Sequence, residues 1–242
     1  MKFITTYKSK NFNTRSKKSI IKFIIIHYTA IKDFNESLEH LCDLKKKVSS
    51  HFVISKHGDI YKLVNENKRA WHAGKSYWKG IKDLNSYSIG IELENTGCEL
   101  DFEEYGNKQI KSLIGLIKKI KLNKKYKISN FNILGHSDIA PMRKSDPGKK
   151  FPWKKLDNLK LSYLPKINKL KQKNEYKKFD IIDYKKKLKK IGYNIRIDRK
   201  KDIDYRQVTR AFQMHYQQHF VRGYPNRETY MLVDQFSKDI VD

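Results

Sequence analysis

The sequence predicts an α/β fold: a mixed central β-sheet flanked by helices, followed by a small C-terminal helical domain. Short β-branched runs alternate with amphipathic helical runs up to about residue 156, which is typical of an α/β sheet. One pair of strand-like runs is joined only by a tight turn, and the strands of such a hairpin are antiparallel, so the sheet should be mixed. After residue 178 only helical periodicity remains.

The elements of the first part can be placed in chain order from their residue patterns. They are a buried strand (19–28), a helix with Asn35 as its candidate N-cap (35–47), a hairpin turning at His57-Gly58-Asp59 (50–64), a strand (88–95), an amphipathic helix (107–123) and a last strand (128–135). The stretch that follows, GHSDIAPMRKSDPGKKFPW (135–153), contains three prolines, which exclude a continuous helix or central strand. We therefore expect a loop there.

The chain is predicted to divide into two domains. The first spans residues 1–165, with its core at about 20–156. Residues 156–178 are polar, rich in Lys and contain a proline, so residues 166–178 are interpreted as a linker. The second domain, 179–242, contains three helical patterns, at 180–192, 204–220 and 226–240.

The charge balance restricts the classes of partner. The chain has 242 residues and a formal net charge of +27, from 53 Lys and Arg against 26 Asp and Glu. Only 9 of the 53 basic residues are Arg, the side chain that reads bases through paired hydrogen bonds. We therefore expect no specific nucleic-acid partner, although a general attraction to anionic surfaces remains open.

Cysteine usage and hydropathy exclude other classes. Cys42 and Cys98 lie far apart without a C-x-x-C motif, which favours two free thiols over a disulfide or a metal site. The longest apolar run, FIII at 23–26, is too short to span a bilayer, so no transmembrane segment is expected. The first residues, MKFITTYKSKNFNTRSKK, lack the apolar core of a secretory signal.

Three side chains in the first domain suggest a metal site. His27 ends the first buried strand, and His136 and Asp146 both lie in the 135–153 loop. Each is ordinary alone, but strand ends at one edge of an α/β sheet converge, and ligands commonly bind there. Two imidazoles and one carboxylate complete the protein ligands of a catalytic zinc site, whose fourth position is left to water.

Five ordered motifs carry a resemblance to a known family. They are IIIHYTA, SSHFVISKHGDIYKLV, AWHAG, SIGIELEN and GHSDIAPMRKSDPGKKFPW. Over residues 20–156 the sequence resembles the zinc-dependent, type-2 N-acetylmuramoyl-L-alanine amidases, the AmpD and AmiD family. The C-terminal LKKIGYNI…VTRAFQMHYQQHF also resembles the small peptidoglycan-binding-type domain of AmiD-like members, which are the most similar branch.

The resemblance implies roles for individual residues. One Zn²⁺ would be bound by His27, His136 and Asp146. Glu92 matches the catalytic glutamate, and Lys144 matches the lysine that stabilises the oxyanion. The residues that match the substrate groove or its surroundings are His51, Trp71, His72 and Ala73.

Two residue patterns around these positions need comment. Strand alternation cannot choose between Glu92 and Glu94 as the catalytic carboxylate, whereas the family match selects Glu92. Ser50 stands where many relatives have Tyr, and a chain that has the glutamate and lacks this Tyr resembles the AmpD/AmiD branch.

The implied function is hydrolysis of the amide between the muramic acid lactyl group, ordinary or 1,6-anhydro, and L-alanine in peptidoglycan or muropeptides. All candidate catalytic groups precede residue 165, so residues 1–165 are expected to fold and hydrolyse alone. We expect a monomer in a bacterial cell. Similarity to AmiD implies the periplasm or cell envelope, and the missing secretory pattern leaves the cytoplasm as the alternative.

Two competing interpretations remain. A noncatalytic peptidoglycan-recognition protein of the same fold is the alternative function, but the complete set of metal and catalytic residues argues against it. A second metal site is the alternative interpretation of HYQQH, where His215 and His219 are four residues apart on a helix. That motif lacks the Glu of H-E-x-x-H, and the neighbouring Phe212 and Phe220 favour a core helix.

Overall fold

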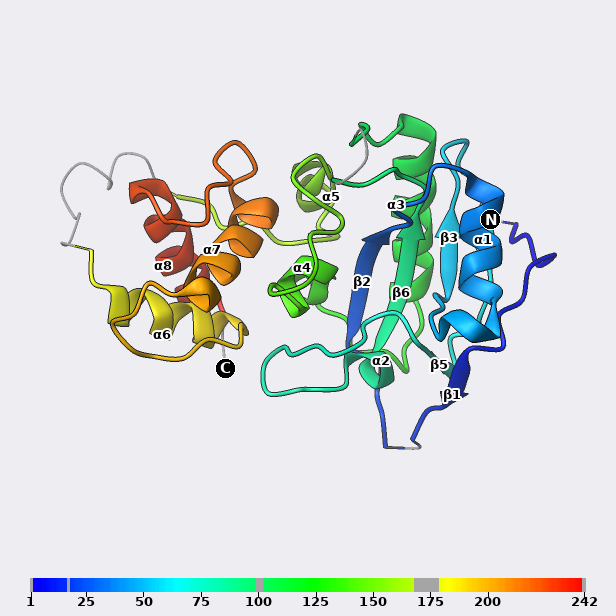
Figure 1. Ribbon diagram of the computed structural model, residues 1–242, viewed down its shortest axis with the longest axis horizontal. Coiled ribbons are helices and arrows are strands. Elements are labelled where there is room, and N and C mark those ends of the chain that lie inside the picture. The colour runs from blue at the N-terminus through cyan, green and yellow to red at the C-terminus, as the bar shows by residue number, and fades with distance from the viewer. Residues whose placement is uncertain (1, 17, 99–101, 168–178, 241–242) are drawn as a thin grey trace.

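The computed structural model describes residues 2–16, 18–98, 102–167 and 179–240, and its centre is a five-stranded sheet (Figure 1). The strands of this sheet are β2 (Phe23–Tyr28), β3 (Phe52–Ile54), β4 (Ile60–Lys62), β6 (Ser88–Leu93) and β7 (Ile133–Gly135). Their order is β4-β3-β6-β2-β7, with β4 antiparallel to β3 and every other neighbouring pair parallel. The predicted mixed sheet is confirmed, and the hairpin is the source of its antiparallel edge. A separate two-stranded sheet pairs β1 (Phe12–Thr14) with β5 (Lys68–Ala70).

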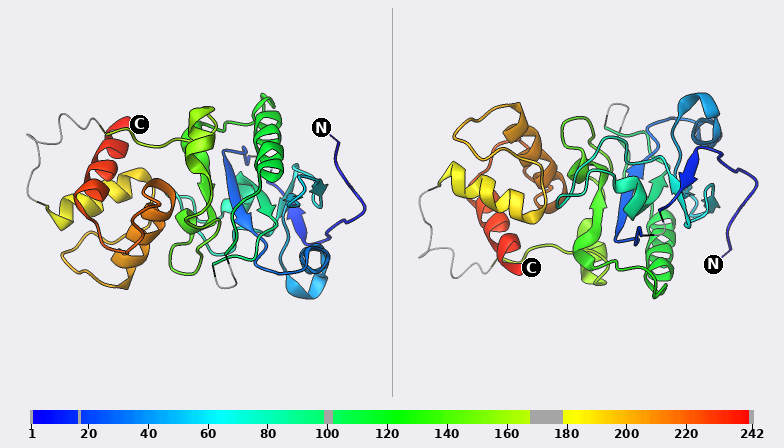
Figure 2. Two further views of the ribbon diagram at one scale, coloured as in Figure 1. Left: turned by 90° about the horizontal axis from the view of Figure 1, so that it is seen from above. Right: turned by 90° about the horizontal axis from the view of Figure 1, so that it is seen from below.

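The helices cover the sheet and build the C-terminal part. They are α1 (Phe34–Cys42), α2 (Leu84–Tyr87), α3 (Asn107–Lys121), α4 (His136–Ile139), α5 (Trp153–Asn158), α6 (Ile181–Ile191), α7 (Ile203–Tyr216) and α8 (Arg227–Asp239), with short 3₁₀ turns at Leu44–Lys46 and Asn130–Asn132. In Figures 1 and 2, α6, α7 and α8 gather at one end of the molecule beside α4 and α5, while the N-terminus lies at the opposite end. No helix of the described ranges is both long and apolar enough to cross a membrane.

The two faces of β2 enter two different hydrophobic cores. Ile24 and Ile26 pack in the core that contains the apolar stripe of α3. Phe23 and Ile25 point to the other face and pack in a core shared with α6, α7 and α8. Because alternate residues of a strand share a face, His27 lies on the same face as Phe23 and Ile25, toward the C-terminal helices.

Strand β6 follows the same division. Ile89, Ile91 and Leu93 belong to the α3 core. The intervening Glu92 therefore points to the face of His27, and the register pairs His27 directly with Glu92. The alternation of the two central strands thus places two polar side chains together at one sheet edge.

The sequence-based elements are correct in type and order, with differences at their ends. The strands are shorter than predicted. Strands β1 and β5 and the short helices α2, α4 and α5 were not predicted; α4 is a single turn that ends before Pro141. Asn35 as N-cap is wrong: the Asp33 carboxylate accepts the Glu36 backbone N–H at 2.8 Å and caps α1. The 166–178 linker lies largely outside the described residues, so that part of the predicted division stays a prediction.

Candidate active site

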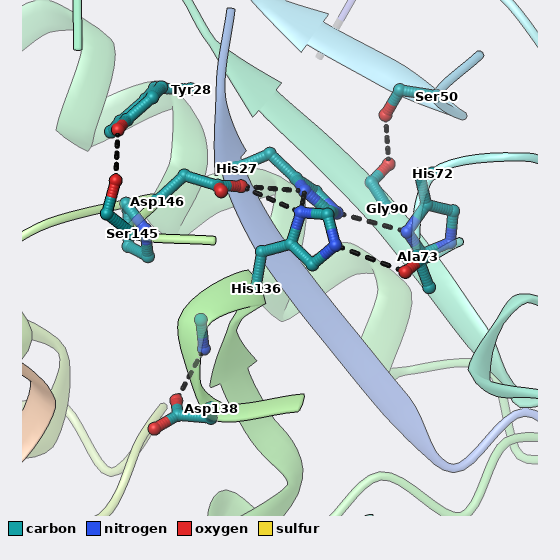
Figure 3. A network of polar contacts seen from close by, with 12 residues as sticks. His27, Tyr28, Ser50, His72, Ala73, Gly90, His136, Asp138, Ser145 and Asp146 are labelled. Atoms are coloured by element: carbon teal, nitrogen blue, oxygen red, sulfur yellow. Dashed lines mark hydrogen bonds and ion pairs between the residues drawn. The ribbon is translucent and has the colours of Figure 1, made fainter. Parts of the chain in front are cut away.

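Three ligand-type side chains converge at the C-terminal edge of the parallel strands (Figure 3). His27 is near the end of β2, His136 begins α4 directly after β7, and Asp146 comes from the loop beyond. The register pairs Ile26 of β2 with Gly135 of β7, which brings the two histidines side by side. His27 Nδ1 lies 2.9 Å from His136 Nδ1, and both nitrogens lie 3.0 Å from Asp146 Oδ2.

The protonation of this cluster follows from the outer partners of the two imidazoles. His136 Nε2 lies 3.1 Å from the Ala73 carbonyl and 3.2 Å from Arg143 Nη2. The two hydrogens of Nη2 go to the carbonyls of Ala73 and Lys75, so His136 Nε2 is protonated and donates to Ala73. His27 Nε2 lies 3.0 Å from His72 Nδ1, and His72 Nε2 lies 3.1 Å from Ser88 Oγ, whose own proton goes to the Leu84 carbonyl. Ser88 Oγ therefore accepts from His72, and His72 Nδ1 accepts from His27. Both Nδ1 atoms are consequently free of protons in the neutral rings.

This arrangement fits a metal ion. Two unprotonated Nδ1 atoms and a carboxylate oxygen face one another with no hydrogen between them, which a cation would satisfy. Ligands of a tetrahedral zinc at 2.0–2.1 Å are about 3.3 Å apart, slightly more than these separations. Each histidine also has the outer hydrogen bond that fixes the tautomer of metal-binding imidazoles. Among the described residues, His27, His136 and Asp146 are the group that could hold a metal.

Electrostatics favour the metal-binding forms of His27 and Asp146. Burial lowers the pKa of His27 to about 4, so its imidazole is neutral near pH 7. Burial alone would raise the pKa of Asp146, but the adjacent His136 and His27 imidazoles hold it well below its usual range. A neutral imidazole and an ionised carboxylate are the forms that coordinate metals.

A second layer positions His72 and Ala73. The Asn85 side-chain oxygen accepts the backbone N–H groups of both residues, at 3.0 and 2.7 Å. The His72 ring lies over Gly90 of β6, where an added Cβ would come within 2.4 Å of the imidazole. Gly90 therefore leaves the space that lets His72 reach His27.

Glu92 and Lys144 line the same pocket as the three ligand-type side chains. The pocket measures about 170 Å³. Glu92 is 8 % exposed, and its Oε2 has no hydrogen-bond partner within the described parts of the chain. Burial and the Asp146 charge raise the pKa of Glu92 well above its usual range, while the Lys144 charge opposes the rise. Glu94 lies outside β6 and instead accepts the Lys56 backbone N–H at 2.7 Å.

The remaining predicted residues lie at different depths. His72 lines the pocket, whereas Ala73 is fully buried and contributes its carbonyl to His136. His51 is fully buried: its Nδ1 accepts the Gly90 N–H and its Nε2 donates to the Lys68 carbonyl. Trp71 is partly exposed and donates to Asn13 Oδ1 at 2.6 Å. His51 and Trp71 are not part of the pocket lining.

Part of the pocket lining and one buried carboxylate were not predicted from the sequence. Residues 29–31 follow His27 and line the pocket, as do Ser37, His40 and Leu41 on α1. Proximity to His27 in the sequence was a usable signal for residues 29–31, whereas nothing in the α1 pattern indicated a pocket. The missed carboxylate is Asp138, within the GHSD motif, which is 1 % exposed.

His215 and His219 do not converge. His215 Nδ1 donates to Asp138 at 2.7 Å, whereas His219 is exposed and lies 2.9 Å from Glu228. This supports the structural interpretation of HYQQH.

A buried two-imidazole, one-carboxylate cluster that could hold a metal ion lies beside a glutamate with an unpaired oxygen, and this arrangement defines a class: a hydrolase centre on an α/β scaffold. The family model described as N-acetylmuramoyl-L-alanine amidase matches residues 16–149. The chain belongs to this amidase family, and the predicted resemblance is confirmed.

Individual relatives agree with this assignment. The chain is 36% identical over 230 residues to the N-acetylmuramoyl-L-alanine amidase AmiD of Escherichia coli. The matched region covers 88% of this chain and 81% of that protein. It is 32% identical over 166 residues to the 1,6-anhydro-N-acetylmuramyl-L-alanine amidase AmpD of Haemophilus influenzae, covering 61% of this chain and 87% of that protein.

Solved structures are similar over nearly the whole chain. The complex of E. coli AmiD with anhydro-N-acetylmuramic acid-L-Ala-D-γ-Glu-L-Lys superposes with a TM-score of 0.81 at 33% identity, covering 93% of this chain and 92% of that chain. The complex of AmpDh3 from Pseudomonas aeruginosa with anhydromuramic pentapeptide gives 0.79 at 29% identity, covering 97% and 98%. Both relatives contain counterparts of most of the C-terminal part.

Proposed function

We propose that this amidase is a zinc enzyme that hydrolyses the amide between the lactyl group of muramic acid and L-alanine in peptidoglycan fragments. The observation that carries the proposal is the alignment of His27, Glu92 and His136 on three adjacent strand ends, with Asp146 closing the cluster. The AmiD and AmpDh3 complexes, each with an anhydromuramic peptide, support the substrate class. Soluble muropeptides with the anhydro sugar are therefore the first substrates to test.

His27, His136 and Asp146 are proposed to hold one zinc ion. The chemistry that zinc supplies when bound is polarisation of the amide carbonyl and activation of a water at neutral pH. His72 and the Ala73 carbonyl keep the two imidazoles in the required tautomer and orientation.

Glu92 is proposed to move the proton. Its Oε2 is unpaired and lines the pocket, so no hydrogen bond of the described structure must break before the carboxylate accepts a proton. A raised pKa makes a carboxylate a better base and allows it to hold the proton until the leaving amine takes it.

Lys144 is proposed to stabilise the oxyanion. Its side chain is exposed, lines the pocket and comes from the same loop as His136 and Asp146. A fixed cation near the carbonyl oxygen gains most when negative charge develops there, which is the condition for lowering the barrier. Trp71 is proposed to contact substrate beyond the pocket. For His51, complete burial favours support of β6 over substrate contact.

The test is mass spectrometry of muropeptides incubated with the purified full chain, with and without a chelator. Release of free peptide beginning with L-alanine is expected, and it should stop with chelator and return with added zinc. An anhydro-muropeptide and its reduced ordinary counterpart, tested in parallel, define the sugar preference. A folded, zinc-loaded protein that binds muropeptides without cleaving them would instead establish the recognition alternative.

We also propose that the protein acts as a monomer in a bacterial cell envelope. Fractionation of the native bacterium and light scattering of the purified chain test these two points. Recovery in the cytoplasm would favour a role in muropeptide recycling there.

A further inference from the structure

The loop of residues 135–153, here termed the catalytic loop, is held by side chains of the C-terminal part, residues 179–240, here termed the helical unit. The contact begins at Asp138, a buried carboxylate two residues after His136. Asp138 Oδ2 accepts the Gly135 N–H at 2.8 Å and His215 Nδ1–H at 2.7 Å, and its Oδ1 accepts the Tyr193 hydroxyl at 2.7 Å. Two of these three donors come from the helical unit.

The other end of the catalytic loop is held by helix α7, which also contributes the His215 contact to Asp138. The His215 imidazole stacks on the Trp153 ring, with centroids 3.6 Å apart and an interplanar angle of 19°. On its other side it stacks on Tyr216 at 3.9 Å and 7°. One imidazole therefore touches both ends of the loop, at Asp138 and at Trp153.

A third contact lies between these two ends. Gln218, just after α7, donates from Nε2 to the backbone carbonyls of Lys149 and Phe151, at 2.6 and 2.7 Å. These contacts bracket Asp146, because they lie on both sides of it in the sequence. Every contact named here falls within the segment that supplies His136, Lys144 and Asp146.

We infer that His215 and Tyr193 are positioning residues of the amidase, through which the helical unit sets the geometry of the metal site. A buried carboxylate needs its hydrogen-bond donors, and losing one leaves a charge that must move or be solvated. Any movement of Asp138 is passed to the Gly135 N–H that it accepts, and Gly135 directly precedes His136. The inference rests on the proposed metal role of His136.

This inference changes the expectation for residues 1–165 acting alone. That fragment contains every proposed catalytic side chain, yet Asp138 would lose two of its donors in it. The AmpD of H. influenzae, matched over 87% of its own length, covers only 61% of this chain, so some members of the family lack this much sequence. In the present chain we propose that the two units are distinct in structure but that the active site depends on both.

The first test uses Tyr193→Phe in the full chain, which removes one hydroxyl and keeps the ring. Tyr184→Phe is the matched control, since Tyr184 is also fully buried in the helical unit but its hydroxyl lies 3.3 Å from Thr209 Oγ1, away from the loop. Zinc affinity by chelator competition and the melting temperature are measured for both. Tyr193→Phe should weaken zinc binding about 10-fold, as loss of outer-shell partners does, and lower kcat with little change in KM. Tyr184→Phe should keep wild-type zinc affinity even where its melting temperature falls.

The second test compares His215→Leu with His215→Asn. Asn can return an N–H donor near the Nδ1 position, whereas Leu cannot, so Asn should recover part of the zinc affinity that Leu loses. Wild-type zinc affinity in Tyr193→Phe and both His215 variants, with only melting temperature reduced, would overturn the inference. If zinc affinity falls as expected but the wild type cleaves no muropeptide, the proposed substrate is wrong and the positioning role stands.

Discussion

The two faces of the central sheet come from the same strands and serve different purposes. On the α3 face, β2 and β6 present mainly apolar side chains, including Ile26 and Ile91, and α3 covers them with apolar residues. On the other face the same strands present His27 and Glu92, which directly follow Ile26 and Ile91 and are paired with each other in the sheet. The α3 face can be stable through burial alone, whereas the polar face needs outer hydrogen bonds and a second unit to hold it.

The kinds of contact on the two faces explain why one face tolerates substitution and the other does not. Apolar packing is non-directional, and similar shapes can replace one another at modest cost. The proposed metal site requires oriented ligands, and we infer that His72, Asn85 and Asp138 orient them through their hydrogen bonds. Substitutions on the two faces should therefore separate stability from function.

Removing a ligand should give the largest effect. His136→Ala removes one of three metal donors and should lose both zinc and detectable hydrolysis, because two donors hold a metal poorly. Elemental analysis and the muropeptide assay are run on one preparation. An active His136→Ala protein, or active wild type free of transition metal, would contradict the metal assignment.

Lys144→Ala should reduce turnover without removing the metal. The loss of a single oxyanion-stabilising group costs about 10²–10³-fold in rate in well-studied enzymes. Zinc content should stay at one per chain, since Lys144 donates nothing to the cluster. Wild-type turnover would remove Lys144 from the mechanism.

A matched pair of leucines tests the comparison of faces directly. Leu116 on α3 and Leu134 on β7 are both fully buried, the first in the α3 core and the second in the core shared with the helical unit. Each Leu→Ala change should cost about 2–5 kcal/mol of unfolding free energy. Only Leu134→Ala, two residues before His136, should also weaken zinc binding. Equal zinc affinities in the two variants would show that the two faces do not differ in their effect on the metal site.

The smallest expected effect is on stability against pH. The pKa of Glu92 is raised in the folded protein, so the stability that its protonated form contributes is complete below the unfolded value of about 4.3 and is lost as pH rises through the folded pKa. In metal-free protein, Glu92→Gln should remove this loss and so raise stability near pH 7 relative to the wild type. Thermal melts of the wild type and Glu92→Gln across pH 4 to 8 measure the difference in stability. A difference that does not change with pH would contradict the raised pKa.

Much of the fold and the site could be predicted from the sequence, because local patterns determined them. The β-branched run at 19–28 indicated β2, and the His57-Gly58-Asp59 turn indicated the antiparallel edge. His27, His136 and Asp146 could be proposed together because strand ends converge. From the sequence, Glu92 could be chosen over Glu94 only through the family resemblance. In the structure, Glu92 lines the pocket and Glu94 does not.

The parts that could not be predicted depend on contacts between distant residues. His72 resembled a groove residue, and its hydrogen bond to His27 depends on the space above Gly90. Asp138 was assigned no role, because its partners lie 55 and 77 positions away at Tyr193 and His215. No local periodicity encodes such pairs.

On the polar face, we propose that Glu92 moves the proton, whereas other residues hold the metal. The most direct test measures zinc content and muropeptide turnover on the same samples of wild type, Glu92→Gln and Glu94→Gln. We predict one zinc per chain in all three, with turnover about 10²–10⁴-fold lower in Glu92→Gln alone. Near-wild-type turnover by Glu92→Gln, or a comparable loss in Glu94→Gln, would contradict the account.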